Sequence, residues 1–392
     1  MEARTQTVGG GRVGALRGLG RRLANVMRLA GKELSSIKAD PVLVLLIAYA
    51  FTYAVYAVAT GAKTEAEDMA VAVVDEDRSD LSRRIRDAFL PPLFKAPAEI
   101  GAGEIDAALD AGRFVFVVVI PPSFAADVLA GRNPSLQVNV DATAMTQAGN
   151  GAVYVQSIVV REVAAFLRRA EGTAALPVDL VVRARFNPNL RSSWFTAVMQ
   201  VINNITMLSV ILTGAALIRE REHGTVEHLL VMPVLPVDIM LAKILANGLV
   251  IVAAASLSLA VVVEWLLAVP IAGSLALFLL GACIYQFSVA ALGILLATFS
   301  TSMAQFGLLA IPVLVVLNLL SGSTTPLESM PVWLQQVMQV SPATRFVAFS
   351  QGVLYRGAGL AIVWPELLAL AAIGAFCFGL SLKRFRRVVF NA

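Results

Sequence analysis

Long uninterrupted apolar runs are the feature that most constrains the fold of this chain. A helix needs about 20 apolar residues to cross the roughly 30 Å hydrocarbon core of a bilayer, and several segments of the 392 residues reach that length. The chain is 58% hydrophobic and only 15% charged, whereas a soluble domain is about 45–50% apolar and about 25% charged. The sequence therefore predicts an α-helical polytopic membrane protein.

Six runs are expected to be transmembrane helices. They lie at about residues 41–60, 194–218, 244–267, 275–299, 305–321 and 361–382. An even number of spans returns both termini to one side of the membrane. Basic residues gather before the first run and after the last, so the positive-inside rule predicts that both termini are cytoplasmic. The net charge of +4 is thus explained by the membrane flanks and does not indicate nucleic acid.

The ends of the chain are predicted to be cytoplasmic segments. In residues 1–40, apolar side chains recur at three- and four-residue steps from Leu16 to Ile37, with arginine and lysine on the other face, which is typical of an interfacial helix. Asp40 precedes Pro41, which disfavours continuing this helix into the first transmembrane helix at 41–61. Residues 384–392 form a basic tail.

Residues 62–192 differ in composition from the rest, because most of the acidic residues lie there. Alternating or β-branched runs predict strands at 69–74, 114–120, 136–140 and 178–185, and helical patterns lie at 79–89, 105–111, 153–169 and after 121–123. We therefore expect an inserted α+β domain. It follows the first span of a chain with a cytoplasmic start, so it is predicted to be extracytoplasmic.

The most informative stretch, at residues 218–234, reads IREREHGTVEHLLVMPV. Four charges of alternating sign stand at the predicted water boundary. Thr225 can cap a helix start, Leu229 and Leu230 offer a small apolar face to a partner, and Pro233 stops the helix. A short cytoplasmic helix joined firmly to two spans could receive force from a soluble motor.

This stretch resembles an R-E-R-E-x-G-T-x-E-x-L-L-x-x-P element of the ABC-2 type permeases, in the subgroup with a large extracytoplasmic domain after the first transmembrane helix. The matching residues are Arg219, Glu220, Arg221, Glu222, Gly224, Thr225, Glu227, Leu229, Leu230 and Pro233. The resemblance extends to VVDEDRSDLSRR at 73–84 and VVIPPSF at 118–124. It implies that residues 193–383 hold transmembrane helices 2–6, with a cytoplasmic coupling helix at 219–235 that contacts an ATPase subunit.

The resemblance further implies the permease subunit of an ATP-binding cassette exporter in the inner membrane. It implies a second permease copy or paralogue and an ATPase that carries ATP and Mg, with a periplasmic adaptor and membrane lipids as further partners. The alternative functions are a non-transporting membrane sensor and an envelope scaffold, both using the extracytoplasmic domain. A membrane enzyme acting on lipids would need clustered carboxylates or histidines, which we do not find in the sequence.

Motifs for catalysis or metal binding are missing from the sequence. No G-x-x-x-x-G-K-[ST] phosphate loop occurs, so ATP hydrolysis is expected on another chain. His223 and His228 have poor spacing for a metal and no cysteine nearby. We predict no catalytic residue, no metal site and no cofactor bound by this chain.

One helical stripe in the second span carries Gln200, Asn203, Asn204 and Met207. Polar groups in a membrane helix are costly and often functional, so this stripe is a candidate lining of the substrate pathway. Interhelical hydrogen bonds that only hold helices together are the equal alternative.

Overall fold

The structure is a computed structural model that describes residues 9–61, 68–141, 145–171, 192–222 and 235–390. The chain divides into two compact units, one formed by Met1–Gly61 with Ser193–Ala392 and the other by Ala62–Ser192.

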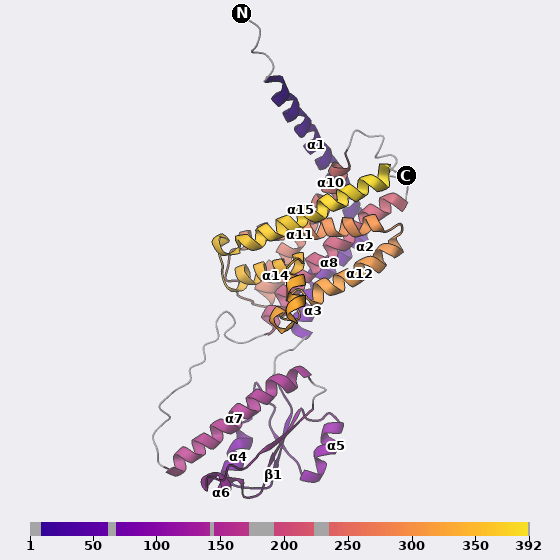
Figure 1. Cartoon of the computed structure of the whole chain (residues 1–392). Helices are drawn as coiled ribbons and strands as arrows, with labels where there is room; N and C mark the ends of the chain where they lie inside the picture. Colours follow the sequence, from indigo (N-terminus) through magenta and orange to yellow (C-terminus); the bar gives the residue numbers. More distant parts are fainter. Residues whose placement is uncertain (1–8, 62–67, 142–144, 172–191, 223–234, 391–392) are drawn as a thin grey trace, which may run out of the picture. The chain divides into compact units, whose positions relative to one another are not determined.

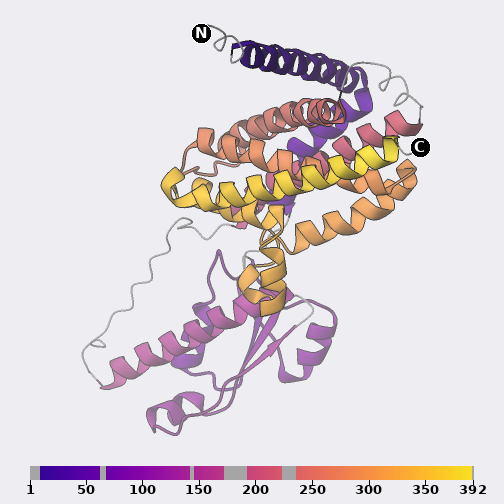
Figure 2. The same cartoon turned by 45° about the horizontal axis from the view of Figure 1, so that its top comes forward.

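The first unit is a bundle of helices (Figures 1 and 2). Within the described residues, five stretches are long and apolar enough to cross a membrane. These are α2 with α3 (Pro41–Phe51 and Tyr53–Gly61), α8 (Ser192–Glu222), α10 continued by the π-helical η2 (Pro236–Ser258 and Leu259–Leu266), α11 (Leu275–Phe299) and α15 (Leu360–Phe390). The remaining predicted span, at about 305–321, corresponds to α12 (Met303–Leu319), which has 17 residues and at 1.5 Å per residue is only about 26 Å long.

The boundary between α1 and α2 is set by Asp40 and Pro41. Helix α1 (Gly9–Ala39) ends one residue before Asp40, as the Asp40-Pro41 pair predicts. The Asp40 carboxylate accepts the backbone N–H groups of Val42 and Leu43 at 3.1 and 3.2 Å. Asp40 therefore caps α2. The first residue of α2 is Pro41, which has no backbone N–H and so leaves no unpaired donor at the helix start.

Helix α8 is the central helix of the bundle (Figure 1). In its most apolar window 72% of the residues are buried within the protein, whereas the corresponding share is 50% or less for the other four spans. Two glycines allow this close packing. A side chain at Gly293 of α11 would meet the backbone of Val210 in α8, and one at Gly214 of α8 would meet the ring of Phe306.

A short helical region at one end of the bundle was not assigned from the sequence. Helices η3 (Leu327–Ser329) and α13 (Val332–Met338) are followed by α14 (Pro342–Ser350) and the π-helical η4 (Gln351–Tyr355). Helix α13 begins directly after Pro331. Phe346 of α14 is fully buried and stacks on Tyr285 of α11 with ring centroids 4.1 Å apart.

The second unit contains a four-stranded sheet in the order β2-β1-β3-β4. Strand β1 (Val71–Asp75) pairs in parallel with β2 (Ala98–Glu99) and β3 (Phe116–Ile120), and β4 (Gln137–Val140) is an antiparallel edge strand. Helices α4 (Asp80–Asp87), α6 (Phe124–Leu129) and α7 (Met145–Glu171) supply side chains to one hydrophobic core, and α5 (Ile105–Asp110) supplies them to the core on the other face.

Most elements of this unit lie where the patterns predict them, including the strand β4. The two-residue strand β2 is too short for a pattern to indicate it. The predicted strand at 178–185 lies outside the described residues.

Candidate functional site

The last turn of α8 carries the charged start of the predicted coupling element. Arg219, Glu220, Arg221 and Glu222 all continue α8 as helix. The remaining predicted residues lie outside the described part of the chain, as do both histidines; they are Gly224, Thr225, Glu227, Leu229, Leu230 and Pro233. The described geometry therefore concerns the point at which the element joins the helical bundle.

A buried ion cluster lies beside this last turn. Lys243 of α10 is only 1% exposed, and its Nζ lies 2.8 Å from Glu220 Oε1 in α8 and 2.9 Å from Glu33 Oε1 in α1. The same ammonium donates to the Ala216 carbonyl oxygen at 3.4 Å. A buried ammonium is costly unless opposite charges and hydrogen-bond acceptors surround it. The three charges therefore stabilise one arrangement of α1, α8 and α10.

The start of α10 is fixed by its own sequence. Asp238 is 4% exposed and accepts the backbone N–H of Leu235 at 3.1 Å, and Pro236 occupies the first turn. Helix α1 packs along α10 and buries Val26 and Ile37. Lys243 thus lies in a helix whose start and whose neighbour are both held in place.

A second set of contacts joins the end of α8 to the link between α11 and α12. Arg221 Nη1 donates to the Ser300 carbonyl oxygen at 2.7 Å. Glu222 Oε1 accepts the backbone N–H of Met303, the first residue of α12, at 2.9 Å. A carboxylate at a helix start is favourable, because the N-terminal N–H groups there carry partial positive charge. The end of α8 is therefore hydrogen-bonded to the link between α11 and α12 and to the first residue of α12.

The site consists of ion pairs and hydrogen bonds between helices. They join the end of α8 to α1, α10 and α12. Among the residues that the structure describes, no group of three or more His, Cys, Asp or Glu side chains could hold a metal ion.

Sequence reasoning singled out Glu220 but missed Lys243 and Glu33. A signal for Lys243 was present, because it is the single basic residue between Asp238 and Glu264 in an otherwise apolar stretch. A charge inside a membrane helix is rare and almost always paired. Glu33 gave a weaker signal: it is the single acidic residue in the sequence from Gly9 to Ala39, but a charged side chain on an amphipathic helix is ordinarily exposed to water.

The four residues of the predicted stripe on α8 lie in two different environments. Asn204 is 3% exposed, and its side-chain amide donates to the Ala50 carbonyl oxygen of α2 at 2.5 Å. Gln200 donates to Asn204 Oδ1 at 3.0 Å, and Gln200, Asn203 and Met207 are half-buried. Asn204 therefore joins two helices, whereas the other three side chains lie on the less covered face of α8.

Comparisons with known proteins agree with this architecture. A family model described as ABC-2 family transporter protein matches residues 41–383. This range begins at the first apolar helix and ends within the last one.

Curated relatives resemble the chain over nearly its whole length. The inner membrane transport permease YhhJ of Escherichia coli is 50% identical over 369 residues, which cover 94% of this chain and 99% of the relative. The probable multidrug ABC transporter permease YbhR of the same organism is 30% identical over 370 residues, covering 92% of this chain and 98% of the relative. The similarly named YbhS is 27% identical over 378 residues, with 93% and 97% covered.

Proposed function

The chain belongs to the ABC-2 transporter family, and from this premise we propose that it is the permease subunit of an ATP-binding cassette exporter. The family supports a transport component that pairs with a separate ATPase rather than an enzyme. The 50% identical relative is named an inner membrane transport permease, which supports a location in the inner membrane. Two further relatives are named as probable multidrug permeases, which supports an amphipathic organic solute as cargo.

One observation carries the coupling part of the proposal: Lys243 joins Glu220 and Glu33 in a single buried cluster. In the proposed mechanism the ATPase, which carries ATP and Mg, moves the coupling helix at 219–235. The first four residues of this element are the end of α8, so the ion cluster passes the movement from α8 to α10 and α1, and the Arg221 and Glu222 hydrogen bonds pass it to the link before α12 and the start of α12. Transmission of this movement requires rigid connections between the helices, because a flexible link would bend and leave the neighbouring helices in place.

The pathway is proposed to run along the less covered face of α8. Gln200, Asn203 and Met207 line it, while Asn204 holds α8 to α2. In this proposal α12 is a sixth, short span. A second copy of the chain or a paralogue completes the cavity, and a periplasmic adaptor contacts the unit formed by residues 62–192.

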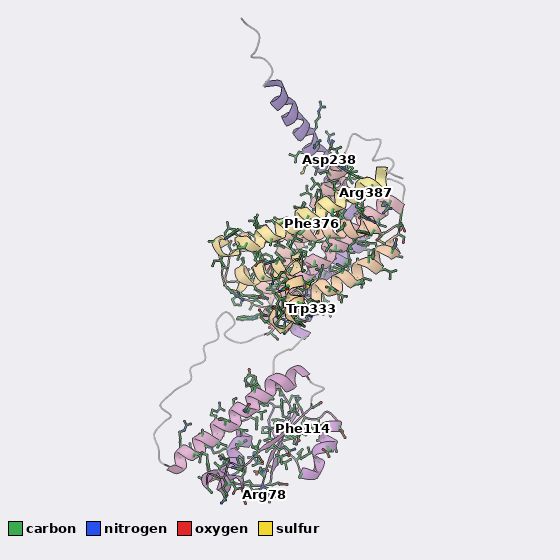
Figure 3. The ribbon with its side chains drawn as sticks, viewed as in Figure 1. Arg78, Phe114, Asp238, Trp333, Phe376 and Arg387 are labelled. Carbon is green, nitrogen blue, oxygen red and sulfur yellow. The ribbon has the colours of Figure 1, made fainter. Side chains whose placement is uncertain are left out.

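The distribution of side chains in the first unit supports an orientation in which both chain termini are cytoplasmic. All four tryptophans lie near one set of helix ends: Trp194 begins α8, Trp265 ends η2, Trp333 lies in α13 and Trp364 begins α15. Figure 3 shows Trp333 at the opposite end of the bundle from Asp238 and Arg387. Tryptophan favours membrane interfaces and basic residues favour the cytoplasmic side, so the tryptophan end is proposed to be the outer one.

The proposal is tested by reconstituting the chain with its ATPase partner in inverted vesicles. We expect ATP-dependent uptake of an amphipathic dye and an ATPase activity that the permease stimulates. A sensor or a scaffold would show neither effect, so a purified complex with no dye uptake and no stimulation contradicts the proposal.

Two substitutions separate the proposed roles within that assay. Glu227→Ala is expected to weaken copurification of the ATPase, because Glu227 lies in the proposed contact. Asn203→Leu is expected to leave the complex and its ATPase intact but to reduce uptake several-fold. Equal uptake by wild type and Asn203→Leu would remove the pathway assignment.

A further inference from the structure

A cavity of about 460 Å³ lies at the tryptophan end of the first unit. Its walls come from the start of α8, the turn after α12, and the helices η3, α14 and η4. Its lining includes Phe195, Leu327, Glu328, Thr344, Val347 and Arg356. Small-molecule sites are typically about 300–1,000 Å³ in volume. The cavity is therefore large enough for an organic ligand, and it is separate from the ion cluster.

Two side chains of opposite charge line this cavity. Glu328 lies in η3 and Arg356 directly follows η4, and both are exposed. Within the described ranges, neither side chain forms an ion pair or a hydrogen bond. Arg345, in the same helical region, differs: its guanidinium lies 3.2 Å from Glu366 and donates to the Gln339 carbonyl oxygen at 2.9 Å. Arg345 is therefore used within the protein, whereas Glu328 and Arg356 face the cavity with their charges available.

The apolar part of the wall is held rigidly. The Phe195 ring stacks on Tyr355 with centroids 6.1 Å apart, and the Tyr355 hydroxyl donates to the Trp194 carbonyl oxygen at 3.1 Å. Leu327 and Val347 add aliphatic surface. A ligand tail at this surface would bury apolar area without reordering the wall.

A buried hydroxyl also points to a ligand. Thr344 is 1% exposed and lines the cavity, and its Oγ1 has no hydrogen-bond partner among the described residues. A buried polar group without a hydrogen-bond partner is energetically unfavourable. A polar ligand atom in the cavity would remove that cost.

We propose that this cavity binds an amphiphile with a zwitterionic head. Its cationic group lies at Glu328, its anionic group at Arg356, and its apolar tail against Phe195, Leu327 and Val347. A ligand with one charge would leave the other protein charge without a partner in the cavity, and charge-assisted contacts are the strong ones. Binding by the permease alone does not require the ATPase, so failure here is distinguishable from failure of the transport proposal.

The experiment uses the full chain in phosphatidylglycerol nanodiscs with lauroyl lysophosphatidylethanolamine, labelled with a fluorophore on its acyl chain. Fluorescence polarisation is measured against empty nanodiscs. We expect saturable binding that is roughly tenfold weaker in Glu328→Gln and in Arg356→Gln, because each removes one charge-assisted contact. Ala348→Trp, at an exposed position of the cavity wall, should abolish binding by filling the cavity.

Matched controls keep the result interpretable. Glu264→Gln and Arg113→Gln remove exposed charges outside the cavity and should bind like wild type. Equal binding by all variants, or equal competition by dodecyl phosphate, dodecylamine and the unlabelled zwitterion, would overturn the proposal. Adding phosphatidylethanolamine to the nanodisc distinguishes the sources: competition with the probe identifies a membrane lipid as the ligand, and no competition identifies a free amphiphile.

Discussion

Lys243 shows how a single buried charge can determine the arrangement of several helices. Its ammonium is in contact with two carboxylates from helices that are far apart in the sequence. Replacing such a cluster by apolar groups is often tolerated, but removing one partner leaves uncompensated buried charge. The main contribution of the cluster is therefore that it favours one arrangement of α1, α8 and α10.

Lys243→Met is expected to lower the free energy of unfolding by roughly 3–5 kcal/mol, because Glu33 and Glu220 would repel each other without the ammonium. Thermal unfolding in detergent measures this. Adding Glu33→Gln and Glu220→Gln to the same chain should restore much of the loss, and Lys32→Met, at an exposed position on α1, should change little. An unchanged unfolding midpoint for Lys243→Met would mean that the cluster does not hold the helices.

At the scale of helices, close approach depends on small residues. Membrane helices have little hydrophobic drive to associate, so van der Waals contact between backbones matters. Gly293 of α11 lies against the backbone of Val210 in α8, where an added Cβ would be 2.6 Å from the Val210 carbonyl oxygen. This contact holds the central helix against α11, next to the half-buried face of the proposed pathway.

Gly293→Ala should therefore separate α8 from α11 and destabilise the protein by roughly 1–3 kcal/mol, the usual range for overpacking. Gly307→Ala in α12 is the matched control. An added Cβ there meets nothing within 4 Å, and alanine favours helix by up to about 1 kcal/mol. The two variants are compared by thermal unfolding in the same detergent, and equal midpoints would contradict the close-packing argument.

At the scale of the whole molecule, the chain combines two units with separate cores. The second unit has its own sheet, covered on one face by α4, α6 and α7 and on the other by α5. The first unit carries exposed apolar side chains on its spans, for example Leu249 at 63% and Phe376 at 71%, which suits contact with lipid. The second unit thus has the core of a water-exposed domain, and the first unit has a surface suited to lipid.

The proposed orientation predicts a labelling pattern across the membrane. A cysteine replacing Glu76, in the second unit, should react with an impermeant maleimide in intact cells. A cysteine replacing His223 should react only in inverted vesicles, because the link after α8 is proposed to be cytoplasmic. Labelling of position 223 from outside would exclude contact with a cytoplasmic ATPase and overturn the coupling proposal.

Some features follow from the sequence alone, because local patterns determine them. Apolar length predicts the membrane helices, the Asp40-Pro41 pair predicts the first helix boundary, and alternating or β-branched runs predict β1, β3 and β4. These signals are local, since helix and strand periodicity depend only on near neighbours in the chain. The charged start of the coupling element could be read in the same way.

Other features depend on contacts between distant residues, which periodicity does not specify. The pairing of Lys243 with Glu33 joins residues 210 positions apart, and the division of the α8 stripe between Asn204 and its neighbours depends on where α2 lies. The short helix α14 has nine residues and is stabilised by its packing on α11, so its own sequence gives too weak a signal. Tertiary structure decided these features, because a buried charge or polar group is stable only where the fold brings it a partner.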